Sequence, residues 1–273
     1  MARKTKIGAT PLVRLESNGF DGLQAYLKDE SANPSGTIKD RRSEHIFQEG
    51  TRLGVDKFTL ISAGNNAFSL SNSANGEIKV VAIIDRGLPQ DIKELLTQQL
   101  HQVIQINLQH KILRPEEVIA FAREREDEVI WDVTNGYEES YGSMVAELRE
   151  LNPDYIVVPI GSGGIYVGVV QAIQRYRMST KVIGIGVQNT MRSAADKLYT
   201  PWTPYAKVMA KFDQLGHKIF RLTEEEIKST WQTHQHLADL EPSSAVVFAA
   251  VKKMTFAPTD TVVFVNSGKI KAP

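Results

Sequence analysis

Apolar and polar positions follow two different rhythms along this chain. Short runs rich in Val, Ile and Leu recur throughout, and between them lie longer stretches whose apolar residues are spaced as on one face of a helix. Strands that alternate with helices in this way are typical of parallel sheets covered by helices, so the predicted fold class is α/β. We predict strands over residues 24–28, 57–61, 79–84, 102–107, 129–131, 155–159, 182–187, 218–222 and 261–265, and helices over residues 40–49, 66–74, 90–100, 115–124, 143–151, 164–177, 224–239 and 243–254.

One long connection interrupts this alternation. Residues 189–207 have mixed polarity and contain Pro201 and Pro204, which predicts a loop over the surface or beside an active site. No internal repeat is visible, and 273 residues suffice for one large domain or two lobes.

Composition narrows the function classes. Lys plus Arg and Asp plus Glu both total 32, so no basic field favours a nucleic-acid partner. No apolar stretch approaches the roughly 20 residues of a membrane span, so no membrane partner is expected. The chain has no cysteine, which excludes disulfides, thiolate metal sites and a cysteine nucleophile. No apolar segment follows the N-terminal residues, so we expect a cytoplasmic protein.

Lys39 is the first candidate for chemistry. It lies in the run NPSGTIKDR, residues 33–41, where a turn signal leads into a helix predicted to begin near Thr37. The positive end of a helix dipole disfavours a protonated amine. A lysine kept partly neutral in this way can form a Schiff base with an aldehyde.

A second loop, LISAGNNA over residues 60–67, joins a predicted strand to a predicted helix. Backbone N–H groups at such a helix start suit a carboxylate or a phosphate, and Gly64 lets the backbone approach a ligand closely. An ordinary left-handed turn with an Asn cap explains the same residues equally well.

A third loop lies in YIVVPIGSGGI, residues 155–165, and has the same order of strand, glycine-rich turn and helix. The N–H groups around Gly161, Gly163 and Gly164 can converge on phosphate oxygens, and Ser162 adds a hydroxyl. No Gly-Lys-Ser/Thr follows, and position 166 is Tyr where a dinucleotide fingerprint needs Gly. We therefore predict a phosphate site, with a dinucleotide site as the alternative.

Near the C-terminal end, Ser267 follows the apolar strand predicted over residues 261–265. Ligands of α/β proteins bind beyond the carboxyl ends of the strands, which is where Ser267 would lie. A plain turn is the simpler interpretation of this Ser-Gly pair.

In this order, the four segments resemble the tryptophan-synthase-β-like superfamily of pyridoxal-phosphate enzymes, also called fold type II. The resemblance extends from TPLVRL, residues 10–15, to Ser267. It implies pyridoxal 5'-phosphate (PLP) as the cofactor and two open parallel-sheet lobes with the cofactor between them. The larger lobe would comprise residues 1–50 and 143–273, the smaller lobe residues 51–142, and the protein would form a homodimer.

The resemblance also implies roles for single residues. Lys39 would hold the cofactor as a Schiff base and later act as the base that removes the substrate α-proton. Asn65 would bond the phenolic oxygen of the cofactor, and Ser267 would meet its pyridine nitrogen. The phosphate would bind at Gly161, Ser162, Gly163 and Gly164, and the substrate carboxylate at Ser62, Ala63, Gly64 and Asn66.

A neutral hydroxyl at Ser267 has a consequence for the reaction. Unlike a carboxylate, it does not keep the pyridine nitrogen protonated, so transamination is discouraged and elimination or replacement at the β-carbon is favoured. The expected activity is that of a lyase or transferase on a small L-amino acid. A PLP-binding regulatory protein without turnover is the alternative outside enzymes.

The motifs divide between members of the superfamily. EPSSA at residues 241–245, Ser69, and residues 267–269 resemble threonine synthase, which converts O-phosphohomoserine to threonine and is the first expectation. Residues 10–15 and 33–41 resemble cysteine synthase at least as much, with O-acetylserine or O-phosphoserine as substrate. Serine/threonine dehydratases come third.

Two tyrosines and two histidines outside these segments are also conspicuous. Tyr137 and Tyr141 lie in a turn-rich stretch where a substrate contact is possible. His234 and His236 are two residues apart in a predicted helix, so they cannot bind one metal from a single face, and a half-buried role is expected.

Overall fold

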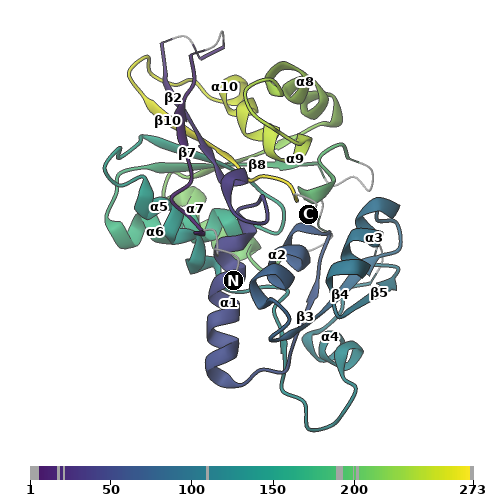
Figure 1. The fold of residues 1–273 in the computed structure, drawn as a ribbon. Helices are drawn as coiled ribbons and strands as arrows, with labels where there is room; N and C mark the ends of the chain where they lie inside the picture. The colour runs from purple at the N-terminus through teal and green to yellow at the C-terminus, as the bar shows by residue number, and fades with distance from the viewer. Residues whose placement is uncertain are drawn as a thin grey trace. The chain divides into compact units, whose positions relative to one another are not determined.

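Every strand predicted from the sequence is present in the structure, a computed structural model that describes residues 6–16, 19–20, 22–108, 111–188, 193–198, 200 and 203–270. The chain divides into two α/β units (Figure 1). Unit 1 comprises Met1–Ile38 and Glu138–Lys269, and unit 2 comprises Lys39–Tyr137 and Ile270–Pro273. The α/β class and the parallel-sheet architecture are confirmed.

Unit 1 is built on a six-stranded sheet in the order β1-β2-β10-β7-β8-β9. All neighbouring strands are parallel except β1, which pairs antiparallel with β2 at the edge. The strands are β1 (Leu12–Arg14), β2 (Gln24–Asp29), β7 (Tyr155–Pro159), β8 (Lys181–Val187), β9 (Lys218–Leu222) and β10 (Thr261–Asn266). The sequence prediction missed β1, whose three residues are all exposed.

Alternate residues of the central strands enter two separate cores, one on each face of this sheet. Val157 and Phe264 pack with Phe248 and Ile227 on one face, whereas Ile156, one residue along β7, packs on the other. Because strand side chains alternate with a period of two, a parallel strand buried on both faces must be apolar throughout, as these strands are.

Helices cover both faces of this sheet. The core of Val157 contains residues of α8 (Glu224–His234), α9 (Pro242–Ala245), the 3₁₀ helix η4 (Val246–Ala249) and α10 (Ala250–Lys253). The core of Ile156 contains residues of α5 (Gly142–Glu147), α6 (Gly164–Tyr176) and α7 (Ala206–Gln214). The labels of the two sets lie on either side of the sheet in Figure 1.

Unit 2 is built on a four-stranded sheet in the order β5-β4-β3-β6, all parallel. Its strands are β3 (Lys57–Ile61), β4 (Lys79–Asp85), β5 (Gln102–Ile106) and β6 (Ile130–Asp132), and its helices are α1 (Lys39–Leu53), α2 (Asn65–Ala74), α3 (Gln90–Gln99) and α4 (Pro115–Ala122). Its main core contains residues of α1, α2 and α3, whereas Val118 and Ala122 of α4 belong to smaller clusters with Ile83 and Val81.

The units differ in their bounds from the predicted lobes, 1–50 with 143–273 and 51–142. Helix α1 belongs to unit 2 because its Ile46 and Phe47 are buried in the main core of that unit, with Phe58 and Leu60 of β3. Lys39 is therefore the first residue of unit 2, whereas the resemblance implied that it lay in the larger lobe.

Several helical predictions differ from the structure. The helices predicted over residues 143–151 and 224–239 end earlier, at Glu147 and His234. The helix predicted over residues 243–254 is divided into α9, η4 and α10, and α7 begins within a segment predicted as a loop. Of that loop, residues 189–192, 199, 201 and 202 lie outside the described part of the chain, and residues 196–198 form the short helix η3 (Asp196–Leu198).

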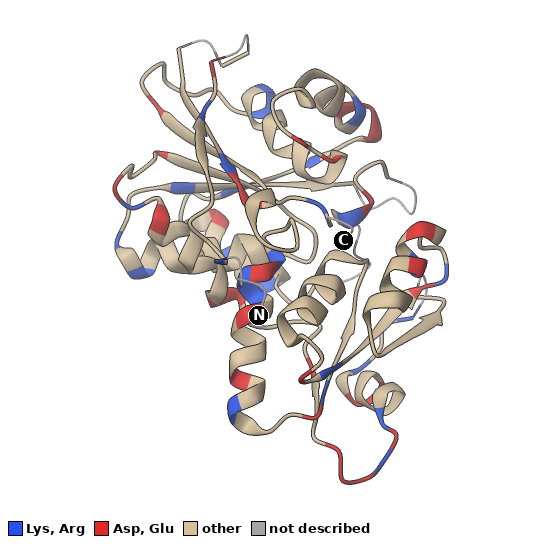
Figure 2. Ribbon diagram, in the orientation of Figure 1, with Lys and Arg blue, Asp and Glu red and all other residues tan. Residues whose placement is uncertain are grey.

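Positively and negatively charged residues are interspersed along the ribbon of each unit (Figure 2), in keeping with the equal totals of 32. No helix in the described ranges has the length and apolar character required to cross a membrane.

Candidate active site

Two contacts within unit 1 fix the backbone immediately before Lys39. Thr37 pairs with Gly268 in an antiparallel bridge, and the N–H of Ile38 donates to the carbonyl of Ser267 at 3.0 Å. Gly268 has φ +75°, and a side chain there would overlap the carbonyl oxygen of Gly36. The end of β10 and the loop of residues 33–38 can therefore approach this closely only because position 268 is glycine.

A buried network holds the other end of this loop. The side-chain amide of Asn33 donates to Glu30 Oε2 at 2.8 Å, and the hydroxyl of Thr10 donates to Glu30 Oε1 at 2.6 Å. Glu30 is fully buried. A buried carboxylate requires such donors, so the Asn of the 33–41 run serves to anchor the loop.

Lys39 begins α1, in agreement with the predicted helix start near Thr37. The next residue, Asp40, accepts a hydrogen bond of 2.5 Å from the hydroxyl of Ser69 in α2, and the Ser69 hydroxyl also lies 2.9 Å from that of Ser43. All three side chains are buried. This contact joins the run of Lys39 to the helix that follows the 60–67 loop.

The 60–67 loop enters α2 with Gly64 as N-cap at φ +127°. The hydroxyl oxygen of Ser62 accepts from the N–H groups of Gly64 at 3.1 Å and Ala67 at 3.2 Å. Since both contacts use the oxygen as acceptor, neither of them uses the hydroxyl proton of Ser62. Asn65 is the first residue of α2, and Ala63 is exposed.

Asn66 adds a second polar group at this helix start. Its side-chain oxygen is buried and accepts no hydrogen bond from the residues that the structure describes. A buried acceptor without a donor is costly, which indicates that a donor outside the described residues completes this loop. A protonated amine or hydroxyl of a ligand meets that requirement.

The glycine loop of residues 161–164 precedes α6 in unit 1. Gly163 is the N-cap, with φ +106°, and no side chain caps the helix. Because the first N–H groups of a helix have no partner within it, this uncapped end suits an anion. A Cβ on Gly161 would lie 3.4 Å from the carbonyl oxygen of Lys197, so η3 closes one side of the loop.

Ser267 follows β10, and its hydroxyl lies 2.9 Å from that of Ser244. Ser244 is completely buried at the start of the short helix α9. Both partners are neutral. Ser244 belongs to the EPSSA segment, residues 241–245.

Glu241, the N-cap of α9, lies three residues before Ser244. Burial, reinforced by Asp196 and Asp239 and opposed by Lys197 and Lys269, raises the pKa of Glu241 to about 7. The carboxyl group therefore changes its charge near neutral pH.

The other residues singled out from the sequence have structural roles. Tyr141 is buried in the core on the α5–α6 face of unit 1, and Tyr137 packs edge-on to His45 in unit 2. His234 stacks on Phe248 at 4.7 Å, and burial lowers its pKa. Among the described residues no group of three or more His, Cys, Asp or Glu is arranged to bind a metal.

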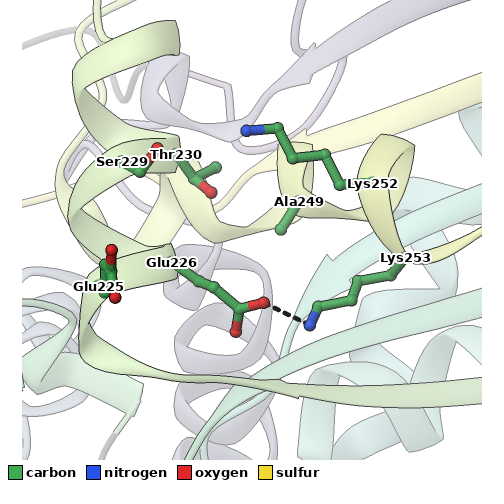
Figure 3. Close-up of a pocket in the computed structure, with 7 residues that line it drawn as sticks. All are labelled: Glu225, Glu226, Ser229, Thr230, Ala249, Lys252 and Lys253. Atoms are coloured by element: carbon green, nitrogen blue, oxygen red, sulfur yellow. Dashed lines mark hydrogen bonds and ion pairs between the residues drawn. The ribbon is translucent and has the colours of Figure 1, made fainter.

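A pocket of about 170 Å³ lies elsewhere in unit 1, between α8 and the η4–α10 segment (Figure 3). Its lining includes the ion pair of Lys253 and Glu226, 2.5 Å apart, together with Ser229 and Lys252. None of the predicted site residues lines it, and the Glu226 carboxylate opposes an anionic ligand.

Comparison with known proteins places these residues in a family. The family model described as pyridoxal-phosphate dependent enzyme matches residues 4–268. An L-serine dehydratase/L-threonine deaminase of Bos taurus is 29% identical over 169 residues, 56% of this chain and 48% of that protein. The chain therefore aligns with about half the length of the serine dehydratases that it matches. A threonine synthase of Halalkalibacterium halodurans is 23% identical and covers 90% of this chain and 76% of its own.

Solved structures share the fold. The O-acetylserine dependent cystathionine beta-synthase of Helicobacter pylori has a TM-score of 0.78 and 18% identity, covering 97% of this chain and 93% of its own. An O-ureido-L-serine synthase has a TM-score of 0.79 at the same identity.

The residues present fit PLP on the evidence of their own chemistry. The uncapped start of α6 suits its phosphate, and Lys39 supplies an amine at a helix start. These features lie in the region that the family model matches, and the chain belongs to the family of pyridoxal-phosphate dependent enzymes.

Proposed function

We propose that this enzyme catalyses elimination or replacement on a small L-amino acid with a leaving group at the β- or γ-carbon, with a threonine-synthase-like reaction as the first candidate. The observation that carries the proposal is the hydroxyl pair of Ser267 and Ser244 at the carboxyl end of β10. Bound PLP supplies an electron sink for the charge that remains at the α-carbon when a proton leaves. Because the hydroxyl of Ser267 is neutral, it does not keep the pyridine nitrogen protonated, and the electron sink stays weak. A weak sink favours expulsion of a leaving group over transamination.

The residues of unit 2 would handle the substrate. The Nζ of Lys39 would hold the cofactor through its aldehyde carbon until the substrate amine displaces it, and the released amine would then take the α-proton from the substrate and return it later. The substrate carboxylate binds at the start of α2, where Ser62 donates its hydroxyl proton and the backbone from Gly64 to Asn66 turns into the helix.

The residues of unit 1 would hold the cofactor. The loop from Gly161 to Gly164 takes the phosphate at the uncapped start of α6. Ser267 would meet the ring nitrogen of the cofactor, and Asn65, from unit 2, would bond its phenolic oxygen. The bonds of Thr37 and Ile38 to the end of β10 would hold the chain before Lys39 in place for the covalent attachment.

The relatives support this class of reaction without choosing one member. The threonine synthase aligns with more of the chain than the serine dehydratases do, 90% against 56%. Ser69, which the resemblance to threonine synthase uses, also has a defined contact with Asp40. Cysteine-synthase-like replacement on O-acetylserine or O-phosphoserine, and serine/threonine dehydration, are the alternatives.

A parallel assay of five amino acids tests the proposal. The purified enzyme with PLP is supplied with O-phosphohomoserine, O-acetylserine with sulfide, O-phosphoserine with sulfide, L-serine and L-threonine. The products are threonine and phosphate for the first, cysteine with acetate or phosphate for the next two, and ammonia with a 2-oxo acid for the last two. We expect turnover with one of these substrates and the highest rate with O-phosphohomoserine.

Lys39→Ala is the matched control, because it removes the amine and leaves the helix start intact. We expect turnover to fall by about 10²- to 10⁴-fold, as for the loss of a general base. After borohydride reduction, mass spectrometry should find the pyridoxyl group on the peptide containing Lys39 in the wild type and on no lysine in the variant. Transamination as the main reaction of the wild type would overturn the proposal.

A further inference from the structure

The glycine loop is covered within unit 1 by the chain that leads into α7. A Cβ on Gly163 would lie 2.9 Å from the sulfur of Met209 and 3.4 Å from the Cβ of Tyr205. The hydroxyl of Tyr205 donates to the carboxylate of Glu138, which ties this cover to the start of the 3₁₀ helix η2 (Glu138–Tyr141). The loop is therefore supported from the side of α7, and Thr203 adds a direct hydrogen bond to this support.

Thr203 makes that bond. Its hydroxyl donates to the carbonyl oxygen of Ser162. The hydroxyl oxygen of Thr203 in turn accepts from the N–H of Tyr205 at 3.1 Å. The N–H can only donate, so the hydroxyl must act as acceptor toward Tyr205. Its single proton is therefore directed to Ser162.

The bond to Ser162 also controls the next N–H group. In a planar trans peptide the C=O of one residue and the N–H of the next point in opposite directions. Fixing the carbonyl of Ser162 toward Thr203 therefore directs the N–H of Gly163 away from Thr203. The φ of +106° at Gly163 is one that only glycine adopts at little cost, so the two residues together set this peptide plane.

We propose that Thr203 is a positioning residue of the phosphate site, which holds the N–H of Gly163 in the orientation that a phosphate oxygen accepts. This rests on the proposed role of the glycine loop. It assigns a function to a residue in the connection between β8 and α7, far in sequence from the loop that it orients.

The experiment compares two cofactors and two variants. Thr203→Val removes the hydroxyl and keeps the shape of the side chain, whereas Thr203→Ser keeps the hydroxyl. Dissociation constants of the apoenzyme are measured by fluorescence quenching for PLP and for pyridoxal, which lacks the phosphate. We expect Thr203→Val to raise the dissociation constant for PLP by about five- to tenfold, the value of one hydrogen bond, and to leave that for pyridoxal unchanged.

The conservative variant and a distant threonine serve as controls. Thr203→Ser should bind PLP within about twofold of the wild type, a difference much smaller than one hydrogen bond. Thr233→Val removes a comparable bond to a carbonyl, that of Thr233 to Ser229 at 2.8 Å in α8, and should leave both dissociation constants unchanged. Circular dichroism spectra and thermal melting curves establish that each variant is folded.

The outcomes separate this inference from the proposed function. A wild type that binds PLP and pyridoxal equally would overturn the phosphate role of the glycine loop itself. If the wild type prefers PLP and Thr203→Val keeps the full preference, the inference about Thr203 is wrong and the phosphate role stands. Equal weakening of both cofactors, or a Thr203→Ser variant as weak as Thr203→Val, would also overturn the positioning role.

Discussion

Ser267 combines two interactions that serve different purposes. Its carbonyl accepts from Ile38 at 3.0 Å, and its hydroxyl meets that of Ser244 at 2.9 Å. The first contact belongs to the backbone and survives any substitution. The second depends on the side chain, so the chemistry at this position can be changed without releasing the loop before Lys39.

Ser267→Asp tests whether the side chain faces the cofactor ring. A carboxylate there raises the pKa of the ring nitrogen, because an adjacent opposite charge favours the protonated form. We expect β-elimination or replacement to fall by at least about tenfold, one pKa unit of differential stabilisation. Amino-group transfer to the cofactor should rise. Both are measured by quantifying products and cofactor forms after single turnovers.

Ser267→Ala is the uncharged control for this prediction. It should weaken cofactor retention slightly and leave the ratio of the two reactions unchanged. An aspartate variant with the product ratio of the wild type would show that position 267 does not face the ring nitrogen.

The sequence could predict which residues begin and end the site loops, but not their partners. Lys39 begins a helix and Gly163 caps one, as the turn and helix signals indicated. The contacts of Ser244 with Ser267 and of Thr203 with Ser162 join residues 23 and 41 positions apart. Such contacts depend on sheet order, which local patterns do not encode.

At the level of elements, the end of β10 and the loop of residues 33–38 are joined at a glycine. Gly268→Ala should destabilise the protein because the new Cβ would overlap the carbonyl oxygen of Gly36, in addition to the strain of φ +75°. We expect a loss of about 2–4 kcal/mol in the free energy of unfolding, measured by urea denaturation. Cofactor retention should fall with it.

Gly54→Ala separates the two causes. Gly54 has a similar φ of +69°, and a Cβ there would meet nothing within 4 Å. Its substitution should therefore cost about 1 kcal/mol, the strain alone. Equal losses in the two variants would mean that the close approach at Gly268 is relieved by a small shift.

Elements without a strong local pattern were the ones that sequence analysis missed. β1 has three exposed residues and owes its strand conformation to pairing with β2. η4 is apolar at every position, so it has no period that would distinguish its turns from those of α9 and α10. The prolines at 201 and 204 favoured a loop, yet α7 begins two residues after the second.

At the scale of the whole molecule, unit 2 buries a lysine that is paired with two carboxylates. In unit 2 the amine of Lys57, 0% exposed, lies 2.9 Å from Glu128 and 3.0 Å from Glu124, whose exposures are 3% and 50%. Burial alone would lower the pKa of Lys57, but its bonds to these carboxylates raise it. The bond to Lys57, helped by the N–H groups of Glu124 and Arg125, lowers the pKa of Glu128 to about 2.

This ion pair predicts how the molecule responds to acid. The pKa of Glu128 is below its usual value of 4.5 in the folded state, so its contribution to stability is complete above pH 4.5 and is lost as the pH falls toward 2. Glu128→Gln should reduce the free energy of unfolding at pH 7 more than Glu124→Gln does, and should flatten its decline in acid. Urea denaturation at several pH values between 7 and 3, followed by tryptophan fluorescence, measures both effects. Identical pH profiles for the two variants would contradict the assignment.

The strand order of unit 1 also determines when the enzyme can be completed during synthesis. β2 lies between β1 and β10, and Asn266 donates to Asp29 at 2.8 Å across 237 residues. While the chain emerges from the ribosome, β2 has only β1 as a neighbour until β10 has been translated. The loop before Lys39 also depends on β10, because its hydrogen bonds go to Ser267 and Gly268, which follow that strand. Cofactor capture would therefore follow the translation of β10, after unit 2, whose four strands all lie between residues 57 and 132, has had time to fold.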